Sequence, residues 1–477
     1  MATMSSASQI LLKQAMERKE QGDNLAAETL YRAVLAQEPA HDEANHNLGL
    51  LLAQRGEEAA SVPYFQAALK SRPDVGQYWL SYAGALLATG HPHEAQMVLT
   101  RGQQRGFGGA AADSLLRQAR TALTPSAADL CVERGTVQVG QGRTGAAVAS
   151  YREAIALAPN HAEAHFRLGS VLSETGNIAE GFAHYMQRAA IVHGGRPWRQ
   201  DRQEPAHRVK HDREQLAYLA ERLGAGSPDF HLEDGARLSC PAVNPANAAP
   251  QLTRQWHDSR PQMVVIDNFL VQAALEKLRL YCAGSTIWRR NYDAGYIGAT
   301  PEDGLACPLM AQIAEEIRTT FPQIIGMHAF RYLGAFKYDS ELSTGTNIHA
   351  DNSAVNVNFY ITPDAANLDP ESGGMDIWDI SAPPGEEMRR YNGDEALARD
   401  FLKRSRARLT RVPHRANRAV IFKSDLFHKT SDCHFDEGYL NKRINISLLF
   451  GHRAHAMSTH GAKQPLGRPR TNDRFGG

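Results

Sequence analysis

The chain has 477 residues, of which 42% are hydrophobic and 22% are charged, so it is long enough for two or three folded domains. Lys plus Arg and Asp plus Glu both total 52, and this balance argues against a general electrostatic surface for nucleic acid or anionic membrane. The five cysteines contain no Cys-x-x-Cys pair, which favours free thiols in a reducing compartment. The polar start and the lack of a long apolar run predict a cytoplasmic protein with no nucleic-acid or membrane partner.

Glycines recur with a step of 34 residues in the first part of the chain. The recurring glycines are Gly22, Gly56, Gly90, Gly142 and Gly176. A small residue in the preceding helix keeps the same spacing, at Ala15, Gly49, Ala83, Gly135 and Gly169. A bulky residue after each glycine does so too, at Tyr31, Phe65, Leu99, Tyr151 and Tyr185. Prolines at 39, 73 and 159 end the second helix of a pair. These positions resemble the tetratricopeptide repeat and predict an α-solenoid over residues 8–193. The interval of 52 residues from Gly90 to Gly142 predicts a degenerate repeat or an extra helix near residues 102–112.

A repeat array of this kind usually offers a concave surface, so we expect a peptide or protein partner on the repeat domain. A stabilising spacer is the alternative. Two segments, His41-Asp42-Glu43 and His161-Ala162-Glu163, resemble metal-binding pairs. They occupy equivalent repeat positions where a helix begins, and acidic residues in a first turn favour the helix dipole. We therefore interpret both as part of the repeats.

Residues 194–258 lose the repeat phase and are predicted to form a linker with one bridging helix, 209–223, that ends at Gly224. In residues 259–453 two helices are expected first, at 272–281 and 308–321. Short strands are expected at 263–270, 329–338, 354–362, 375–378, 419–422 and 444–450, the first of them preceding the helices. The alternation in 355–360 suits an antiparallel sheet with one wet face. The pattern favours a jelly roll buttressed by helices, followed by a disordered tail at 454–477.

Three residues of this half form a candidate metal site: His349, Asp351 and the distant His428. Two imidazoles and one carboxylate that hold three adjacent positions, with the opposite three open, suit a non-haem Fe(II) that must admit oxygen and a co-substrate. A second His-x-Asp segment, His434-Phe435-Asp436, has too little chain after it to return a distal histidine on another strand. The sequence therefore favours His349, Asp351 and His428 as catalytic metal ligands.

The context of these residues resembles the 2-oxoglutarate- and Fe(II)-dependent dioxygenases, whose fold is a double-stranded β-helix. The shared features are His349-x-Asp351, a distal histidine after a strand, and an arginine on the next strand, followed two residues later by Asn445. The resemblance implies that Arg443 binds the far carboxylate of 2-oxoglutarate, with Tyr338 and Asn445 in the same pocket. It also implies Fe(II), 2-oxoglutarate and O2, with ascorbate as an optional reductant. The 15 residues between His428 and Arg443 leave Lys442 as the alternative carboxylate partner.

The resulting hypothesis is a two-domain hydroxylase whose repeats present a peptide or protein side chain, by resemblance to peptidyl prolyl and aspartyl hydroxylases. Two alternatives stay open: a small-molecule hydroxylase with repeats used for assembly, and a repeat scaffold with a vestigial jelly roll. One further segment, residues 386–418, is rich in arginine and lysine. It is either a basic lid that selects acidic substrates or a solvated helix on the outside of the barrel.

Overall fold

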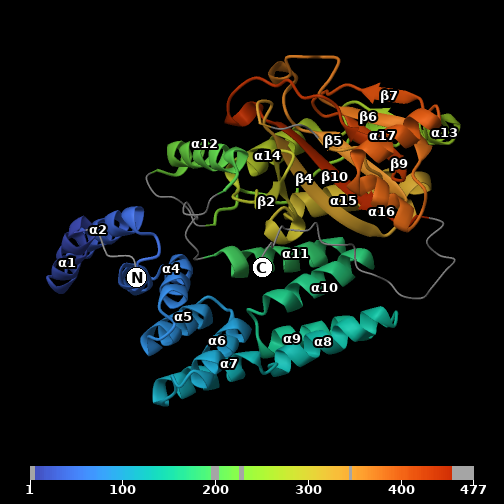
Figure 1. Cartoon of the computed structure of the whole chain (residues 1–477). Helices are drawn as coiled ribbons and strands as arrows, with labels where there is room; N and C mark the ends of the chain where they lie inside the picture. The colour runs from blue at the N-terminus through green and yellow to red at the C-terminus, as the bar shows by residue number, and fades with distance from the viewer. Residues whose placement is uncertain (1–5, 195–203, 225–229, 343–345, 454–477) are drawn as a thin grey trace. The chain divides into compact units, whose positions relative to one another are not determined.

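The computed structural model describes residues 6–194, 204–224, 230–342 and 346–453. The chain divides into two compact units, Met1–Ser126 and Ala127–Gly477, and each is considered by itself (Figure 1). In the described residues no helix is long and apolar enough to cross a membrane. The predicted tail, 454–477, lies outside the described residues.

The first unit consists of antiparallel helix pairs with one additional helix at its end. The pairs are α1 with α2, α3 with α4, and α5 with α6; the bounds are α1 Ser6–Glu20, α2 Asn24–Gln37, α3 Asp42–Gln54, α4 Glu58–Ser71, α5 Gly76–Ala88, α6 Pro92–Gln104 and α7 Ala110–Leu123. Each pair turns at a glycine with positive φ, at 22, 56 and 90. Helix α7 accounts for the long interval after Gly90, and it is the extra helix that the spacing predicts.

The small residue in the first helix of a pair is required by close helix packing. A Cβ atom built on Gly49 of α3 would lie 2.8 Å from the ring of Phe65, which is buried on α4. By contrast, a Cβ on Gly84 of α5 would meet no atom within 4 Å. The two positions are therefore a matched pair for testing the packing.

Gly49→Ala is expected to lower the free energy of unfolding by about 1–3 kcal/mol, because the added methyl group overpacks the α3–α4 interface. Gly84→Ala is expected to raise it by up to about 1 kcal/mol, because alanine loses less backbone entropy than glycine in a helix. Urea unfolding of both variants measures the difference. Equal effects at the two positions would contradict this account of the repeat glycine.

Four more repeat helices belong to the second unit: α8 Ala127–Gly140, α9 Thr144–Leu157, α10 Ala162–Glu174 and α11 Ile178–His193. Ile178 and Phe182 of α11 are buried in the same core cluster as Ile317 and Phe330 of the sheet-containing part. Arg331 also pairs with Glu174 at 2.7 Å. The division between compact units falls at residue 126, within the predicted repeat domain of 8–193, because the second repeat block shares an apolar core with the sheet-containing part.

The predicted bridging helix is present as α12, Ala206–Leu223, and it ends at Gly224 with φ of 83°. Further helices are α13 Pro250–Asp258, α14 Gln272–Gly284, α15 Pro308–Thr320, α16 Glu386–Gly393 and α17 Glu395–Arg404. Both α14 and α15 contribute residues to the large core cluster that also contains the outer face of the main sheet. The helices expected at 272–281 and 308–321 are therefore confirmed.

Ten strands form two antiparallel sheets in the described residues of the second unit. A seven-stranded sheet has the order β1-β8-β5-β10-β4-β3-β2, and a three-stranded sheet has the order β7-β6-β9. Their bounds are β1 Met263–Ile266, β2 Arg290–Tyr292, β3 Tyr296–Ala299, β4 Phe330–Tyr338, β5 Val355–Tyr360, β6 Met375–Ser381, β7 Leu409–Val412, β8 Ala419–Lys423, β9 Leu426–Thr430 and β10 Arg443–Phe450. Strands β2, β3, β7 and β9 have no counterpart among the predicted strands.

The two sheets face each other across an apolar layer that contains Tyr360 and Phe422 of the larger sheet with Met375 and Ile377 of the smaller one. The expectation of a wet face on β5 is wrong. Asn356 and Asn358 alternate with apolar residues as predicted, but both are buried. The polar face of β5 points into the space between the sheets, so its alternation marks a polar interior and not a solvated surface.

A buried lysine on β4 makes the stability of this unit depend on pH. The Nζ of Lys337 lies 4.1 Å from the ring centre of Tyr439 and 4.5 Å from that of Trp288, and burial lowers its pKa from 10.5 to about 7. The unfolded chain therefore binds more protons between pH 7 and 10.5, and the free energy of unfolding rises with pH across that window.

Lys337→Met is expected to raise the free energy of unfolding at pH 7 by about 1–4 kcal/mol, because a side chain of similar length replaces a buried charge. It is also expected to remove the contribution of Lys337 to the rise with pH. Denaturant unfolding at several pH values between 7 and 10 measures both effects. Lys277→Met, which breaks an ion pair with the exposed Asp234, is the control. An unchanged pH profile in Lys337→Met would contradict the assignment.

Candidate metal centre

The structure brings together the three residues proposed as metal ligands. One potential ligand atom from each of His349, Asp351 and His428 lies within 4.8 Å of the others, and this is the one such group found in the described residues. His349 and His428 form an antiparallel bridge, in which each backbone N–H donates to the carbonyl of the other residue. The ring centres are 4.3 Å apart. Two histidines far apart in the sequence therefore share one end of the space between the sheets.

Each imidazole is oriented by a backbone carbonyl. Nδ1 of His349 lies 2.8 Å from the carbonyl oxygen of Asn347, and Nδ1 of His428 lies 2.9 Å from that of Leu426. Since a carbonyl oxygen only accepts hydrogen bonds, both rings carry a proton on Nδ1. Nε2 of each ring is then the nitrogen that can bind a metal. A second partner that fixes the tautomer in this way is typical of metal-binding histidines.

The carboxylate of Asp351 faces the same point. Its Oδ2 lies 3.5 Å from Nε2 of His428 and accepts a hydrogen bond of 2.9 Å from the side-chain amide of Asn356. Burial by itself would raise the pKa of Asp351, but the two imidazoles and Asn356 outweigh it and the pKa is lowered. Burial and the neighbouring His428 lower the pKa of His349. An ionised carboxylate together with two imidazole nitrogens is a donor set that a divalent metal accepts, so these three residues fit Fe(II).

Arg443 begins β10 and points into the space between the sheets, where 1% of its surface is exposed. Its guanidinium donates to the carbonyl oxygens of Gly373 and Gly374 and to Oδ1 of Asn445. Among the described residues no carboxylate pairs with it. A buried cation without an anionic partner is costly, which makes Arg443 a candidate receptor for an anionic ligand.

The loop before β6 packs so closely against the end of β7 that Gly374 has no room for a side chain. A Cβ atom on Gly374 would lie 1.9 Å from the carbonyl oxygen of Val412, and Gly373 has φ of 76°. These two glycines belong to the Glu371-Ser372-Gly373-Gly374 segment, and their carbonyl oxygens hold the guanidinium. The two glycines therefore allow a tight loop whose carbonyl oxygens hold the guanidinium of Arg443 in place.

The adjacent Lys442 lies outside this space. Its Nζ pairs with Asp339 and lies 3.5 Å from Glu214 of α12. Lys442 is thus already neutralised by carboxylates of the protein. The sequence leaves Lys442 and Arg443 as alternative partners for a ligand carboxylate. Of the two, Arg443 is the one that has no carboxylate partner among the described residues.

Tyr338 and Asn445 both lie next to Arg443, as the resemblance implies. Tyr338 is the register partner of Arg443 on β4, and the guanidinium carbon lies 4.7 Å from the centre of its ring. The side-chain amide of Asn445 donates a hydrogen bond of 3.4 Å to the hydroxyl of Ser447. The same hydroxyl accepts a hydrogen bond of 2.7 Å from Asn358. A strip of buried polar side chains therefore runs along β10 and β5 from Arg443, and Asn356 at the far end of β5 contacts Asp351.

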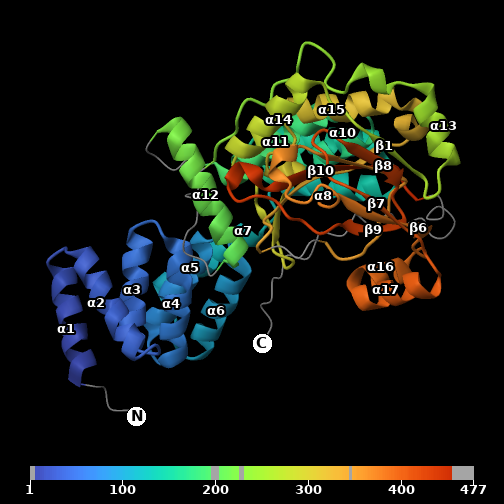
Figure 2. The same ribbon diagram turned by 90° about the horizontal axis from the view of Figure 1, so that it is seen from above.

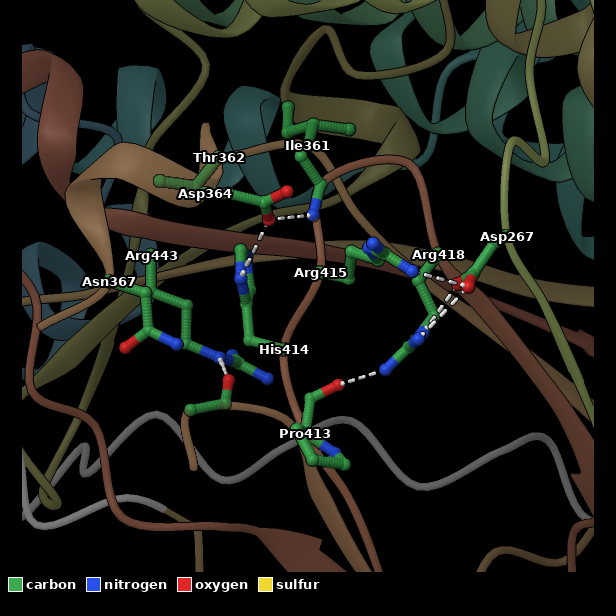
Figure 3. Close-up of polar contacts among 12 residues, drawn as sticks. Asp267, Ile361, Thr362, Asp364, Asn367, Pro413, His414, Arg415, Arg418 and Arg443 are labelled. Atoms are coloured by element: carbon green, nitrogen blue, oxygen red, sulfur yellow. Dashed lines mark hydrogen bonds and ion pairs between the residues drawn. The ribbon is translucent and has the colours of Figure 1, made fainter. Parts of the chain in front are cut away.

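A further residue beside Arg443 is His414, which belongs to no motif of the sequence. Figure 3 shows its ring between Arg443 and Asp364, with Asp267 holding Arg415 and Arg418 farther along the same loop. Burial and the charges of Arg443, Arg418 and Arg279 lower the pKa of His414 to about 3, so the ring is neutral. Nδ1 of His414 lies 3.9 Å from a carboxylate oxygen of Asp364, which is too far for a hydrogen bond, and Nε2 makes none. The buried hydroxyl of Tyr360 makes no hydrogen bond either. No sequence pattern connects these residues, because they meet only through the pairing of the sheets.

The basic residues of segment 386–418 are mostly exposed, which agrees with the interpretation as a solvated helix on the outside of the barrel; the basic lid stays a prediction. The apolar residues of the segment are buried against the metal-ligand strands, including Met388, Ala398 and Leu402, while Arg390, Lys403 and Arg406 are exposed. Arg411 pairs with the buried Asp376 at 2.8 Å. Helices α16 and α17 of this segment are therefore amphipathic and form part of the fold around the site.

Comparison with known proteins identifies the repeats. Residues 12–75 match a model of the tetratricopeptide repeat, and residues 122–176 match a TPR repeat model. No curated protein matches the chain.

Among solved structures, the chain is similar to MamA from Desulfovibrio magneticus RS-1, with 17% identity and a TM-score of 0.24 over 42% of this chain and 100% of that one. It is also similar to the Sgt2 TPR domain from Aspergillus fumigatus, with 16% identity and a TM-score of 0.23 over 25% of this chain and 80% of that one. The first TPR of Spaghetti (RPAP3), bound to an HSP90 peptide, has 16% identity and a TM-score of 0.24 over 25% of this chain and 96% of that one. From the matches to the repeat models we conclude that residues 12–75 and 122–176 are tetratricopeptide repeats.

Proposed function

We propose that this protein is a 2-oxoglutarate- and Fe(II)-dependent dioxygenase that hydroxylates a peptide or protein side chain, with the repeats helping to present the substrate. The observation that carries the proposal is the convergence of His349, Asp351 and His428 at one end of a buried polar strip, with Arg443 at the other. The strip joins a donor set suited to Fe(II) to an arginine suited to a dicarboxylate.

His349, Asp351 and His428 would bind the metal through three adjacent coordination positions. When bound, Fe(II) would supply the oxidising chemistry by binding O2 and the keto acid. Arg443 would pair with the far carboxylate of 2-oxoglutarate, with Tyr338 and Asn445 holding the guanidinium in place. The neutral His414 and the hydroxyl of Tyr360, neither of which makes a hydrogen bond, add hydrogen-bonding groups beside Arg443. The facing sheets favour the jelly roll of this family, and their burial of these groups keeps water away from the reacting atoms.

The repeats support a macromolecular substrate more than a small one, because such arrays commonly present a surface for a peptide. The RPAP3 structure, with its HSP90 peptide, illustrates this use of the repeat. The small-molecule alternative predicts that turnover does not depend on the first compact unit. A truncation that removes residues 1–126 separates the two, since removing 1–193 would take away part of the core of the second unit.

The decisive experiment measures succinate formed from 2-oxoglutarate by the full-length protein after anaerobic loading with Fe(II). Succinate that requires both Fe(II) and O2, together with a +16 mass shift in peptides captured by the repeats, is the expected result. A folded protein that binds no metal and forms no succinate would refute the proposal and leave a repeat scaffold with a vestigial sheet domain.

A further inference from the structure

Helices α16 and α17, which connect β6 to β7, pack against the strand ends that carry the metal-ligand candidates. One buried cluster joins residues of the two helices to Ile348, Ala350 and Phe427. Ile348 and Ala350 flank His349 in the sequence, and Phe427 precedes His428. Figure 2 shows the two helices side by side, next to β6 and β9. The helix pair thus packs against the backbone segments that carry the proposed ligands.

Asn392, in the last turn of α16, makes two hydrogen bonds to the backbone of Ala350. Its side-chain carbonyl oxygen accepts from the Ala350 N–H at 2.9 Å, and its amide donates to the Ala350 carbonyl oxygen at 2.8 Å. A side-chain amide that pairs with both backbone groups of one residue acts as a neighbouring strand would. Ala350 is the single residue between His349 and Asp351.

The two edges of this short extended segment are held by different parts of the protein. On one edge, the backbone of His349 pairs with His428, and the N–H of Asp351 donates to the carbonyl of Ser424. In an extended chain the groups of the next residue point the opposite way. Ala350 therefore offers its N–H and carbonyl to the other edge, and Asn392 fills that edge.

We propose that Asn392 is a positioning residue for the metal centre: by pairing with Ala350 it fixes the relative orientation of His349 and Asp351. The inference rests on the proposed metal site and adds to it a residue that touches neither metal nor substrate. His428 is oriented separately, by its own Nδ1 contact with Leu426 and by β9. Loss of Asn392 should therefore disturb two of the three ligands and leave the third in place.

The test uses Co(II) as the probe, because its affinity and its visible spectrum both report ligand geometry without catalytic turnover. Asn392→Ala in the full-length protein is expected to weaken Co(II) binding by about 10- to 100-fold, the usual effect of losing a partner that orients metal ligands, and to change the visible spectrum of the bound ion. Asn392→Asp is expected to weaken Co(II) binding to a similar extent. Its carboxylate still accepts from the Ala350 N–H, but it turns a second acceptor oxygen toward the Ala350 carbonyl, where the amide donates in the wild type.

Asn244→Ala is the matched control. Asn244 is also half-buried, and it likewise accepts from one backbone N–H, that of Ala246, and donates to one backbone carbonyl, that of Asn268. Neither residue adjoins a proposed ligand. This variant is expected to bind Co(II) with wild-type affinity and spectrum, so any general loss of stability from removing such an asparagine is measured separately.

Wild-type affinity and spectrum in Asn392→Ala would overturn the inference while leaving the metal centre intact. If the alanine variant does not fold, Asn392→Asp carries the same comparison, and an unchanged spectrum there would also overturn it. A folded wild-type protein that binds no Co(II) would instead refute the proposed function, and the inference with it.

Discussion

His349→Ala is expected to abolish metal binding. The variant removes one of three donors that lie within 4.8 Å of one another, and it also removes the ring whose Nδ1 is already oriented by Asn347. Loss of a direct ligand should exceed the ~10- to 100-fold loss that results from removing an outer partner. Equilibrium binding of Mn(II) or Co(II) measures the affinity.

Thermal unfolding gives a second measurement of the same change. A metal present at 100 times its dissociation constant stabilises the folded protein by about 2.7 kcal/mol, and this gain should be absent from His349→Ala. His434→Ala is the control, because His434 belongs to the other His-x-Asp segment and its side chain is exposed. Equal loss of binding in both variants, or in neither, would contradict the assignment of the ligands.

Arg443→Ala is expected to raise the dissociation constant of 2-oxoglutarate by about 30- to 4,000-fold. Truncating one partner of a buried, hydrogen-bonded charge pair costs about 2–5 kcal/mol, and every 1.4 kcal/mol is about tenfold in affinity. Titration of 2-oxoglutarate into the Mn(II)-loaded protein measures the change directly. Metal affinity should stay close to the wild-type value, since Arg443 donates to Gly373, Gly374 and Asn445 and not to a metal-ligand candidate.

Lys442→Ala is the matched control for this prediction, because it removes the neighbouring cation whose partners are Asp339 and Glu214. Its effect on 2-oxoglutarate binding should be within a few-fold of the wild type. If Lys442→Ala weakens 2-oxoglutarate binding and Arg443→Ala does not, the carboxylate partner is the lysine, and Arg443 is a structural residue held by the glycine loop.

The repeats were readable from the sequence because each depends on contacts within one helix pair. The glycine turns, the small residue opposite a ring, and the prolines recur at one period since every repeat meets the same local packing problem. The extra helix α7 was predicted from an interval that did not fit the period. The period could not reveal that the second repeat block shares its core with the sheets through Ile178 and Phe182, because that contact joins residues far apart in the chain.

In the sheet-containing part, fewer elements could be predicted from the sequence than in the repeats. Long alternating strands such as β4, β5 and β10 were predicted, whereas β2, β3, β7 and β9 are short or run straight into loops and carry little pattern of their own. The alternation of β5 correctly predicts a strand, but the solvated face that it also predicts is buried. Periodicity reports that one face is polar, but only the partner sheet decides whether that face meets water or a buried site.

By itself, the amino-acid sequence determined the helical repeats, the position of the main strands and the residue types of a candidate iron site at His349, Asp351 and His428. Only the tertiary structure brought those three side chains within reach of one another and showed Arg443, not Lys442, as the buried cation without a carboxylate partner among the described residues. It also placed Asn392 and His414 beside them. The physical reason is that a ligand type can be recognised locally, whereas the groups that orient it, neutralise it or leave it unpaired come from elements joined through non-local pairing.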